Sequence, residues 1–404
     1  MISEPQRFLL SCLSDFLHNH PTKYAAEPDW AAVFDLAGRH SVAGIVYYQC
    51  NETMPEALRK KYLNRYLGEA VASIRREALV KELAGRFEEV SLSAVFMKGA
   101  VYRDYYPLPP LRSMGDIDIV IRKADKDAVD RILRDGMGFD RFIENHSVWT
   151  YWKDNLYLEV HNRMFYEELA NKVDYCSYFD EIWAHVREAQ VFAASSPAIC
   201  VPEENFHFLY LMAHTAKHVL NNGSGFRAYL DMIFMTQALA DVLDWAYLQA
   251  ELEKLGLLTF TKTCFSCCEK WFGVNMPLRL ETLDEGLLER ITEKTFRDGA
   301  FGLENVENKP AAAARDIRRS DSPYFFAAVK RGIKKLFPPY RDLQLVPWYS
   351  FIDGKPWLLP FVWVYRFFYC GIRKLRHSVK LLAEPFTKKK EVVERQALMR
   401  EWGL

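Results

Sequence analysis

The spacing of apolar residues changes twice along the chain. Up to about residue 90, apolar residues recur every three or four positions, and residues 55–90 are rich in Ala, Leu, Glu, Lys and Arg, which is typical of helices. From about residue 91 the pattern shortens: SAVFMKG is a brief apolar run that ends in glycine, and DIDIVIR alternates strictly. After about residue 166 the helical spacing returns. These patterns predict two helical regions separated by a segment of strands.

The strand segment also contains a helix and a hairpin. A proline-rich loop separates its first two strands, and KADKDAVDRILRDGMGF then has the pattern of a helix that ends at its glycines. VWTYWKD and NLYLEVHNR are predicted to be two strands joined by a turn at Asp154 and Asn155. The order is strand, loop, strand, helix, hairpin, so we expect a small mixed β-sheet.

This order predicts an α+β fold in which a sheet core is flanked by helical regions. We expect four parts: an N-terminal helical region (1–90), an α/β core (91–165), a helical domain (166–300), and a basic, aromatic-rich C-terminal helical region (301–404). Length supports several units, because 404 residues, half of them hydrophobic, can form more than one core.

Charge is balanced overall but uneven along the chain. Lys plus Arg equals Asp plus Glu at 53 each, whereas from Pro323 onward there are 16 basic and 6 acidic residues, a net of +10 that leaves about −10 on the rest. The eight cysteines are scattered, which favours reduced thiols. We found no secretory signal and no apolar run of about 20 residues, so we expect a cytoplasmic protein without a transmembrane segment.

Two aspartates stand one residue apart in the second strand. Alternation places Asp116 and Asp118 on one face and the isoleucines that follow each of them on the other. Two carboxylates on one face repel each other unless a cation lies between them. Glu159, in the middle of a later strand, supplies a third carboxylate, and hard oxygen ligands of this kind suit Mg²⁺. The alternative is that the aspartates belong to a solvated strand face.

Residues around the aspartates are suited to binding phosphate. Lys98 and Gly99 close the preceding strand, where glycine permits close approach of a phosphate to the backbone. Arg112 and Ser113 come just before Asp116 and are placed to contact triphosphate oxygens.

The runs KGA, YYPLPPLRSMGDIDIVI, GMGF and LEVHNRM resemble the uncharacterised bacterial nucleotidyltransferase-like family of the DNA polymerase beta superfamily. The resemblance covers most of residues 30–240. It implies that Asp116, Asp118 and Glu159 are catalytic and ligate two Mg²⁺ ions, for which Mn²⁺ is expected to substitute. One departure concerns the phosphate turn, where the superfamily usually has Gly-Gly or Gly-Ser. This chain has Gly99 and Ala100, so a hydroxyl contact to the phosphate is missing.

The activity implied by the resemblance is transfer of a nucleoside monophosphate from a nucleoside triphosphate to an acceptor hydroxyl. The acceptor can be a small molecule, a glycan or a protein, and the sequence does not identify it. Two alternatives remain: a non-catalytic or regulatory descendant that binds a nucleotide or a partner, and an RNA-directed enzyme. The acidic first 322 residues do not favour a nucleic-acid partner.

A polar group later in the chain has two interpretations. His214 and His218 share one helical face, and Arg227 and Asp231, also four apart, could pair with each other. These residues either line the cleft opposite the carboxylates or form a buried polar network between helices.

The C-terminal run WLLPFVWVYRFFYCGIRKL mixes aromatic and basic residues. Three interpretations are open: completion of the helical core, peripheral attachment to an anionic membrane, and nucleic-acid binding. We expect the first, in which the aromatic residues are mostly buried and the protein shows little binding to anionic vesicles. The second predicts an exposed apolar patch at Trp357, Phe361, Trp363 and Phe367.

Overall fold

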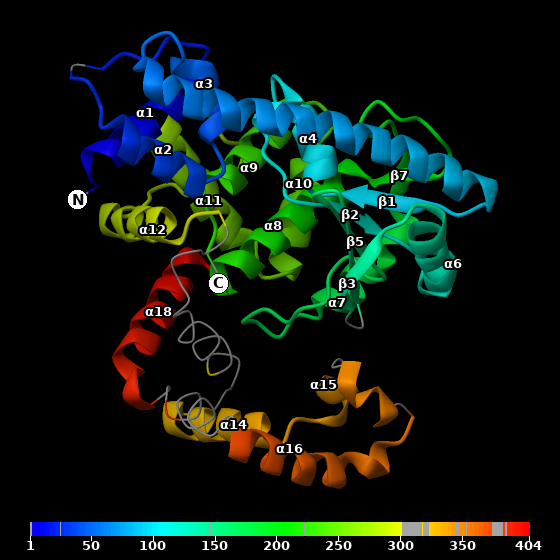
Figure 1. Cartoon of the computed structure of the whole chain (residues 1–404). Helices are drawn as coiled ribbons and strands as arrows, with labels where there is room; N and C mark the ends of the chain where they lie inside the picture. The colour runs from blue at the N-terminus through cyan, green and yellow to red at the C-terminus, as the bar shows by residue number, and fades with distance from the viewer. Residues whose placement is uncertain are drawn as a thin grey trace.

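The structure is a computed structural model that describes residues 2–24, 26–144, 147–221, 223–300, 317, 323–344, 347–352, 354–373, 383 and 386–404. It confirms the predicted α+β class, with a mixed sheet surrounded by helices (Figure 1). The description below follows the chain through the helices that precede the sheet, the sheet itself, and the helices that follow it.

The N-terminal helices include one that is unusually long. After α1 (Glu4–Leu17), α2 (Trp30–Arg39) and α3 (Ala43–Cys50), α4 (Glu56–Glu89) runs for 34 residues, close to the predicted 55–90. Its first half contributes Tyr62 to the main helical core, and its second half contributes residues such as Val80 and Leu83 to the core beneath the sheet. Helix α4 therefore links the N-terminal helices to the sheet (Figure 1).

The sheet has seven strands in the order β3-β4-β5-β2-β1-β7-β6. Strand β1 (Ala94–Met97) is antiparallel to β2 (Ile117–Val120), and β2 is parallel to β5 (Leu156–His161). Strand β5 forms the predicted hairpin with β4 (Val148–Lys153). Asp154 and Asn155, at its turn, both have positive φ, 49° and 64°, as a tight two-residue hairpin turn requires.

Three strands were not anticipated from the sequence. Strand β3 (Asp140–Glu144) pairs with β4, and β6 (Val186–Glu188) pairs with β7 (Ile199–Pro202), which lies parallel to β1. The prediction that the chain returns wholly to helix after residue 166 is therefore wrong for residues 186–202. The sequences of these three strands, DRFIE, VRE and ICVP, do not alternate between apolar and polar residues, and their pairing partners decide their conformation.

Helices α5 (Gly99–Tyr102), α6 (Lys126–Arg131) and α7 (Tyr175–Asp180) are short connections within the sheet region. Helix α6 continues as a π-turn through Gly136 and ends near the predicted glycines. The larger helical body that follows consists of α8 (Glu204–Asn221), α9 (Phe226–Ala238), α10 (Trp245–Lys254), α11 (Leu258–Phe272) and α12 (Glu285–Asp298).

The two faces of β2 enter different cores. Ile117 and Ile119 pack with the α4 residues beneath the sheet, whereas Val120 belongs to the core that contains residues of α8 and α9. Because side chains alternate along a strand, Asp118 is on the same face as Val120. The predicted alternation is confirmed, and it directs Asp118 toward α8 and α9.

The C-terminal region contains α14 (Tyr324–Leu336), α15 (Tyr340–Gln344), α16 (Leu359–Arg373) and α18 (Lys389–Trp402). Helix α18 returns to the body, where Met399 and Trp402 are buried in the main core. In the parts of the chain that the structure describes, no helix combines the length and apolarity needed to cross a membrane.

The expected burial of the C-terminal aromatic residues is wrong. Trp357, Phe361 and Phe367 are 67%, 68% and 69% exposed. Trp363 is partly buried, beside a small cluster that includes Tyr349 and Val362. The reason is geometric: α14 and α16 are covered on one side only, so the aromatic residues on their other side face solvent.

Candidate functional site

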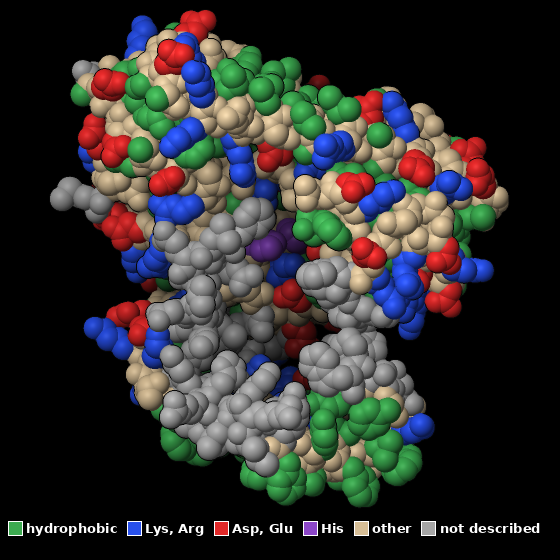
Figure 2. Space-filling view, in the orientation of Figure 1, with side chains coloured by type: hydrophobic (Ala, Val, Ile, Leu, Met, Phe, Trp, Pro, Cys, Tyr) green, Lys and Arg blue, Asp and Glu red, His purple; other side chains and the backbone are tan. Residues whose placement is uncertain are grey.

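The site is a cleft between the sheet and the helical body. It encloses a cavity of about 320 Å³ lined by residues from the β1–α5 turn, β2, β5, α8 and α9. Figure 2 shows histidine, basic and acidic side chains inside this hollow. The residues singled out in the sequence that line it are Lys98, Gly99, Arg112, Asp116, Asp118, Glu159, His214, His218, Arg227 and Asp231. Ala100 and Ser113 are not among the lining residues.

Strand register brings two of the three carboxylates together. Because β2 and β5 are parallel neighbours, Asp118 lies directly opposite Glu159, and His161 follows on the same face. His161 Nε2 is 2.9 Å from Asp118 Oδ1 and 3.5 Å from Glu159 Oε2. One ligand atom from each residue lies within 4.8 Å of the other two, a spacing that could hold a metal ion.

Asp116 lies immediately before β2 and lines the same cleft, but it is not part of this tight group. Burial and the charge of Asp118 raise the pKa of Asp116 to about 6, against the opposing charge of Lys98. The predicted cluster of three carboxylates is therefore arranged as Asp118 and Glu159 with His161, and Asp116 stands beside them. A carboxyl with a raised pKa marks a place where added positive charge would be favourable.

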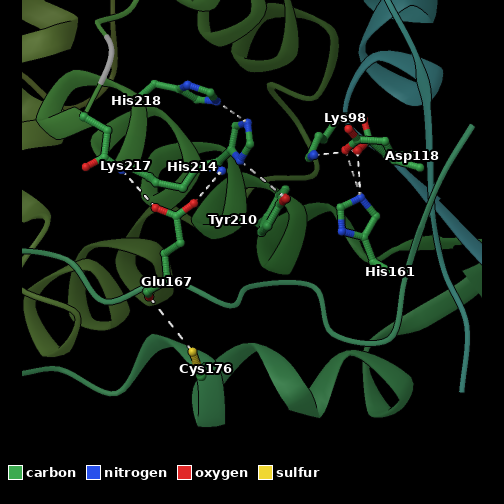
Figure 3. A network of polar contacts seen from close by, with 11 residues as sticks. Lys98, Asp118, His161, Glu167, Cys176, Tyr210, His214, Lys217 and His218 are labelled. Atoms are coloured by element: carbon green, nitrogen blue, oxygen red, sulfur yellow. Dashed lines mark hydrogen bonds and ion pairs between the residues drawn. The ribbon is translucent and has the colours of Figure 1, made fainter. Parts of the chain in front are cut away.

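Lys98 acts as the counter-ion of Asp118. Its Nζ is 2.5 Å from Asp118 Oδ1 (Figure 3), and its backbone, with φ of 54°, donates its N–H to His207 Nε2 at 3.4 Å. Burial alone would lower the pKa of Lys98, but the charge of Asp118 raises it well above its usual range. Burial likewise would raise the pKa of Asp118, but Lys98 and His161 hold it well below its usual range. The two charges stabilise each other.

The glycine of the predicted phosphate turn is required by a different neighbour. A Cβ on Gly99 would lie 2.4 Å from Arg112 Nη1 and 2.9 Å from Met114 Cε, so only glycine fits here. Ala100, the next residue, is fully buried in the core beneath the sheet. The close approach inferred from the sequence exists, but in this structure it is made by an arginine.

Arg112 joins the proline-rich loop to α9. Its Nε and Nη2 donate to the two carboxylate oxygens of Asp231 at 3.0 and 2.8 Å, and Tyr106 donates its hydroxyl to the same carboxylate at 2.8 Å. Burial alone would lower the pKa of Arg112, but pairing with Asp231 raises it. The sequence suggested Arg227 as the partner of Asp231, whereas the bidentate partner is Arg112.

Ser113 is turned toward α4. Its hydroxyl donates to Glu69 Oε1 at 2.6 Å, and its carbonyl accepts a hydrogen bond from Arg227 Nη1 at 3.2 Å. Ser113 therefore positions Arg227 through its backbone, while its side chain fixes the loop against α4.

The α8 wall of the cleft carries two histidines and a lysine. His214 Nε2 and His218 Nε2 are 2.9 Å apart, and Lys217 Nζ is 3.6 Å from Glu167 (Figure 3). Burial, reinforced by the charge of Lys217, lowers the pKa of His214 well below its usual value and that of His218 to about 3. Both imidazoles are therefore neutral near pH 7. The two interpretations of these histidines combine, because the pair both lines the cleft and belongs to a buried network.

Sequence reasoning missed His161 and Lys217. His161 stands two residues after Glu159 on one strand, so the alternation that paired the aspartates also places it on the same face. Lys217 lies on the same helix as the two histidines, but nothing in the sequence shows whether a lysine faces a cleft or solvent.

The fold and the cleft define an α+β protein whose sheet presents a carboxylate–histidine cluster to a basic helical wall. A family model described as "uncharacterised nucleotidyltransferase" matches residues 26–273, more than half of the chain, and the protein belongs to this family. No curated protein and no solved structure matches the chain. The matched segment contains the whole sheet, and α14 to α18 lie outside it.

Proposed function

We propose that the protein is a Mg²⁺-dependent nucleotidyltransferase of the DNA polymerase beta type, which transfers a nucleoside monophosphate from a nucleoside triphosphate to an acceptor hydroxyl. The observation that carries the proposal is the pairing of Asp118 with Glu159 on adjacent parallel strands, facing a cleft with basic side chains on its far wall. Family membership supports the reaction class. Small molecules, glycans and proteins are all acceptors of suitable chemistry.

The donor set fits a divalent cation. Asp118 and Glu159 provide carboxylate oxygens, Asp116 adds a third carboxylate in the same cleft, and oxygen ligands suit Mg²⁺ and Mn²⁺. His161 is fully buried, and its Nδ1 has no hydrogen-bond partner among the described residues. We propose that His161 holds the carboxylate of Asp118 in place through Nε2, as a positioning residue. Two ions, held by Asp116, Asp118 and Glu159, complete the proposed site.

When bound, the ions supply charge for the leaving pyrophosphate and lower the pKa of the acceptor hydroxyl. The chain's own groups divide the remaining work. Glu159, whose side chain is 30% exposed to the cleft, is placed to position the acceptor and receive its proton. The neutral imidazoles of His214 and His218 do not add charge to the cleft.

Lys217 and Arg227 are the proposed contacts of the triphosphate. Both line the cavity, and burial lowers the pKa of each. For Lys217, the charge of Glu167 partly offsets this effect of burial on the pKa. A buried cation gains most from an anionic ligand, since such a ligand compensates the lost hydration. The contact first predicted for the turn at residues 98–100 is limited to its backbone, because Ala100 has no polar side chain and Lys98 already pairs with Asp118.

The test is nucleotide transfer by the purified protein. We would incubate it with each α-labelled nucleoside triphosphate and Mg²⁺, with and without cell extract, and follow label transfer to any acceptor. Asp118→Asn should reduce transfer more than it reduces nucleotide binding, because the metal site chiefly stabilises the transition state. Asp127→Asn, an exposed acidic position on α6, is the matched control and should behave as wild type. Nucleotide binding that is equal in EDTA and in Mg²⁺ would contradict the mechanism.

A second candidate is a nucleotide-binding protein without transfer activity. It is favoured by one observation, the ion pair between Lys98 and Asp118, which occupies an oxygen that a metal would need. Isothermal titration and the label-transfer assay together separate the two candidates. The second predicts nucleotide binding that does not change with Mg²⁺ in the titration, and no label transfer with any nucleotide.

A further inference from the structure

Helix α14 buries small side chains and leaves large apolar side chains exposed to solvent. It buries Ala327 and Ala328 against Ile317 and Val392, and it exposes large apolar side chains. The exposed set follows helical spacing along one face: Phe325, Phe326, Val329, Ile333 and Phe337. A soluble helix normally buries its large residues and exposes its small ones.

Helix α16 repeats this arrangement. Val362 is buried and Trp363 partly buried in the small cluster with Tyr349, whereas the opposite face is open to solvent. That open face carries Phe361, Val364, Tyr365, Phe367 and Phe368, each more than half exposed.

The two helices form one layer. Trp363 donates its Nε1–H to the carbonyl of Pro338 at 2.9 Å, and its ring lies 5.5 Å from that of Phe337. Figure 1 places α14 and α16 together at the lower edge of the molecule, where Figure 2 shows hydrophobic side chains gathered on the surface. We call these exposed apolar side chains of α14 and α16, with Trp357, the aromatic face.

The charge around the aromatic face is predominantly basic. Neither α14 nor α16 contains Asp or Glu, and Lys330, Lys334 and Lys335 are exposed on α14. Lys334 also lies 3.5 Å from Asp342 of α15. The surrounding segment, from Pro323 onward, carries the net charge of +10 noted above.

We propose that the aromatic face docks on the surface of an anionic phospholipid bilayer. Aromatic side chains suit the headgroup region, and the lysines would contact the anionic headgroups. Helices of 13 and 15 residues without spanning length are suited to lie in the interface. A second copy of the chain is a poorer partner, because a symmetric contact through this face would bring like charges together.

The proposal is independent of nucleotide transfer. The aromatic face belongs to a segment outside residues 26–273, the part shared with the family. Vesicle binding can therefore be measured on the full chain without nucleotide or metal, and its failure would leave the proposed activity untouched.

The experiment is co-sedimentation of the full chain with two kinds of vesicle, phosphatidylcholine alone and phosphatidylcholine mixed with phosphatidylglycerol. At low salt we expect at least about tenfold more protein to bind the anionic vesicles, and added salt should weaken this binding, because headgroup attraction is screened. Phe361→Ser with Phe367→Ser should abolish binding. Lys330→Gln with Lys334→Gln and Lys335→Gln should remove the preference for anionic lipid.

Ile74→Ser is the matched control, because Ile74 is 69% exposed on α4, away from the aromatic face, and this variant should bind as wild type. Circular dichroism and urea midpoints verify that each variant is folded. Equal binding to both vesicles, or no binding to either, would overturn the proposal. So would a dimer in sedimentation velocity that Phe361→Ser dissociates while no vesicle binding occurs, which would assign the face to a second copy of the chain.

Discussion

The cleft and the aromatic face place side chains in opposite kinds of unfavourable environment. In the cleft, charged groups such as Lys98, Asp118 and Arg112 are removed from water, and each has a partner within the chain. On the aromatic face, residues such as Phe361 are left in water, and no described residue covers them. A buried charge without a partner in the folded chain is strongly destabilising, whereas an exposed apolar group costs little until an external partner covers it. The cleft should therefore be sensitive to mutation in the isolated protein, and the aromatic face should not.

Breaking the pair between Arg112 and Asp231 should have the largest effect on stability. Asp231→Asn leaves a buried guanidinium without its counter-charge, and we expect the free energy of unfolding to fall by about 3–5 kcal/mol. The matched control is the exposed bidentate pair of Arg163 and Asp180, where Asp180→Asn should cost less than about 1 kcal/mol. Urea unfolding measures both, and similar costs would remove the contrast between a buried and an exposed pair.

A methyl group at Gly99 tests the packing of the same region. Gly99→Ala must displace Arg112 or Met114, so we expect the free energy of unfolding to fall by about 1–3 kcal/mol. Gly115→Ala adds a methyl group to open space in the loop just before Asp116 and should have little effect on stability. Equal thermal midpoints for the two variants would show that Arg112 moves freely.

Lys217 tests the proposed phosphate contacts. Lys217→Gln keeps a polar side chain but removes the charge, and we expect nucleotide binding to weaken about tenfold with little change in the catalytic step. Lys61→Gln, on the exposed side of α4, is the control. A loss in kcat without a change in nucleotide affinity would assign Lys217 to the chemistry instead.

Asp116 gives the cleft a dependence on pH in EDTA. Its pKa of about 6 lies above the ordinary value of 3.8, so between these limits the folded protein binds a proton more tightly than the unfolded chain does. This contribution to stability is present below about pH 4 and is lost as the pH rises through 6, a change of up to about 3 kcal/mol. Other titrating groups, such as His214 and His218, contribute to the urea unfolding of wild type and Asp116→Asn alike, so the difference between the two free energies of unfolding should change across this range. Parallel curves would contradict the raised pKa.

The aromatic face should give the smallest effect in the isolated protein. Phe361→Ser removes an exposed ring, so the free energy of unfolding should change by less than about 0.5 kcal/mol. Phe87→Ser, a buried ring of α4, is the matched comparison and should cost several-fold more. A large loss of stability in Phe361→Ser would show that the ring is covered within the protein, and the comparison between the two regions would fail.

Several features of the site follow from short-range patterns in the sequence. Alternation in the DIDIVI run places Asp118 on one face and Ile117 and Ile119 on the other, and the two cores confirm it. The turn at Asp154 and Asn155 was also predicted from the sequence, because Asp and Asn tolerate the positive φ angles that a two-residue hairpin turn requires.

Pairings between residues far apart in the sequence could not be predicted from the sequence. Arg112 and Asp231 are 119 positions apart, and only the packing of α9 against the proline-rich loop brings them together. The same limit applies to β7, whose pairing with β1 depends on a segment about 100 residues away. Amphipathic spacing in α16 showed that one side is apolar, but spacing alone does not show which side the rest of the chain covers.

The place of β1 in the sheet has a consequence for how the protein folds. Strand β1 pairs on one side with β2, which is close in sequence, and on the other with β7, which follows only after the hairpin and α7. During synthesis, β1 therefore has an open edge until Pro202 has emerged, and unpaired edges favour aggregation. We expect fragments that end near residue 165 to be insoluble, and fragments that extend beyond β7 to be the shortest that complete the sheet.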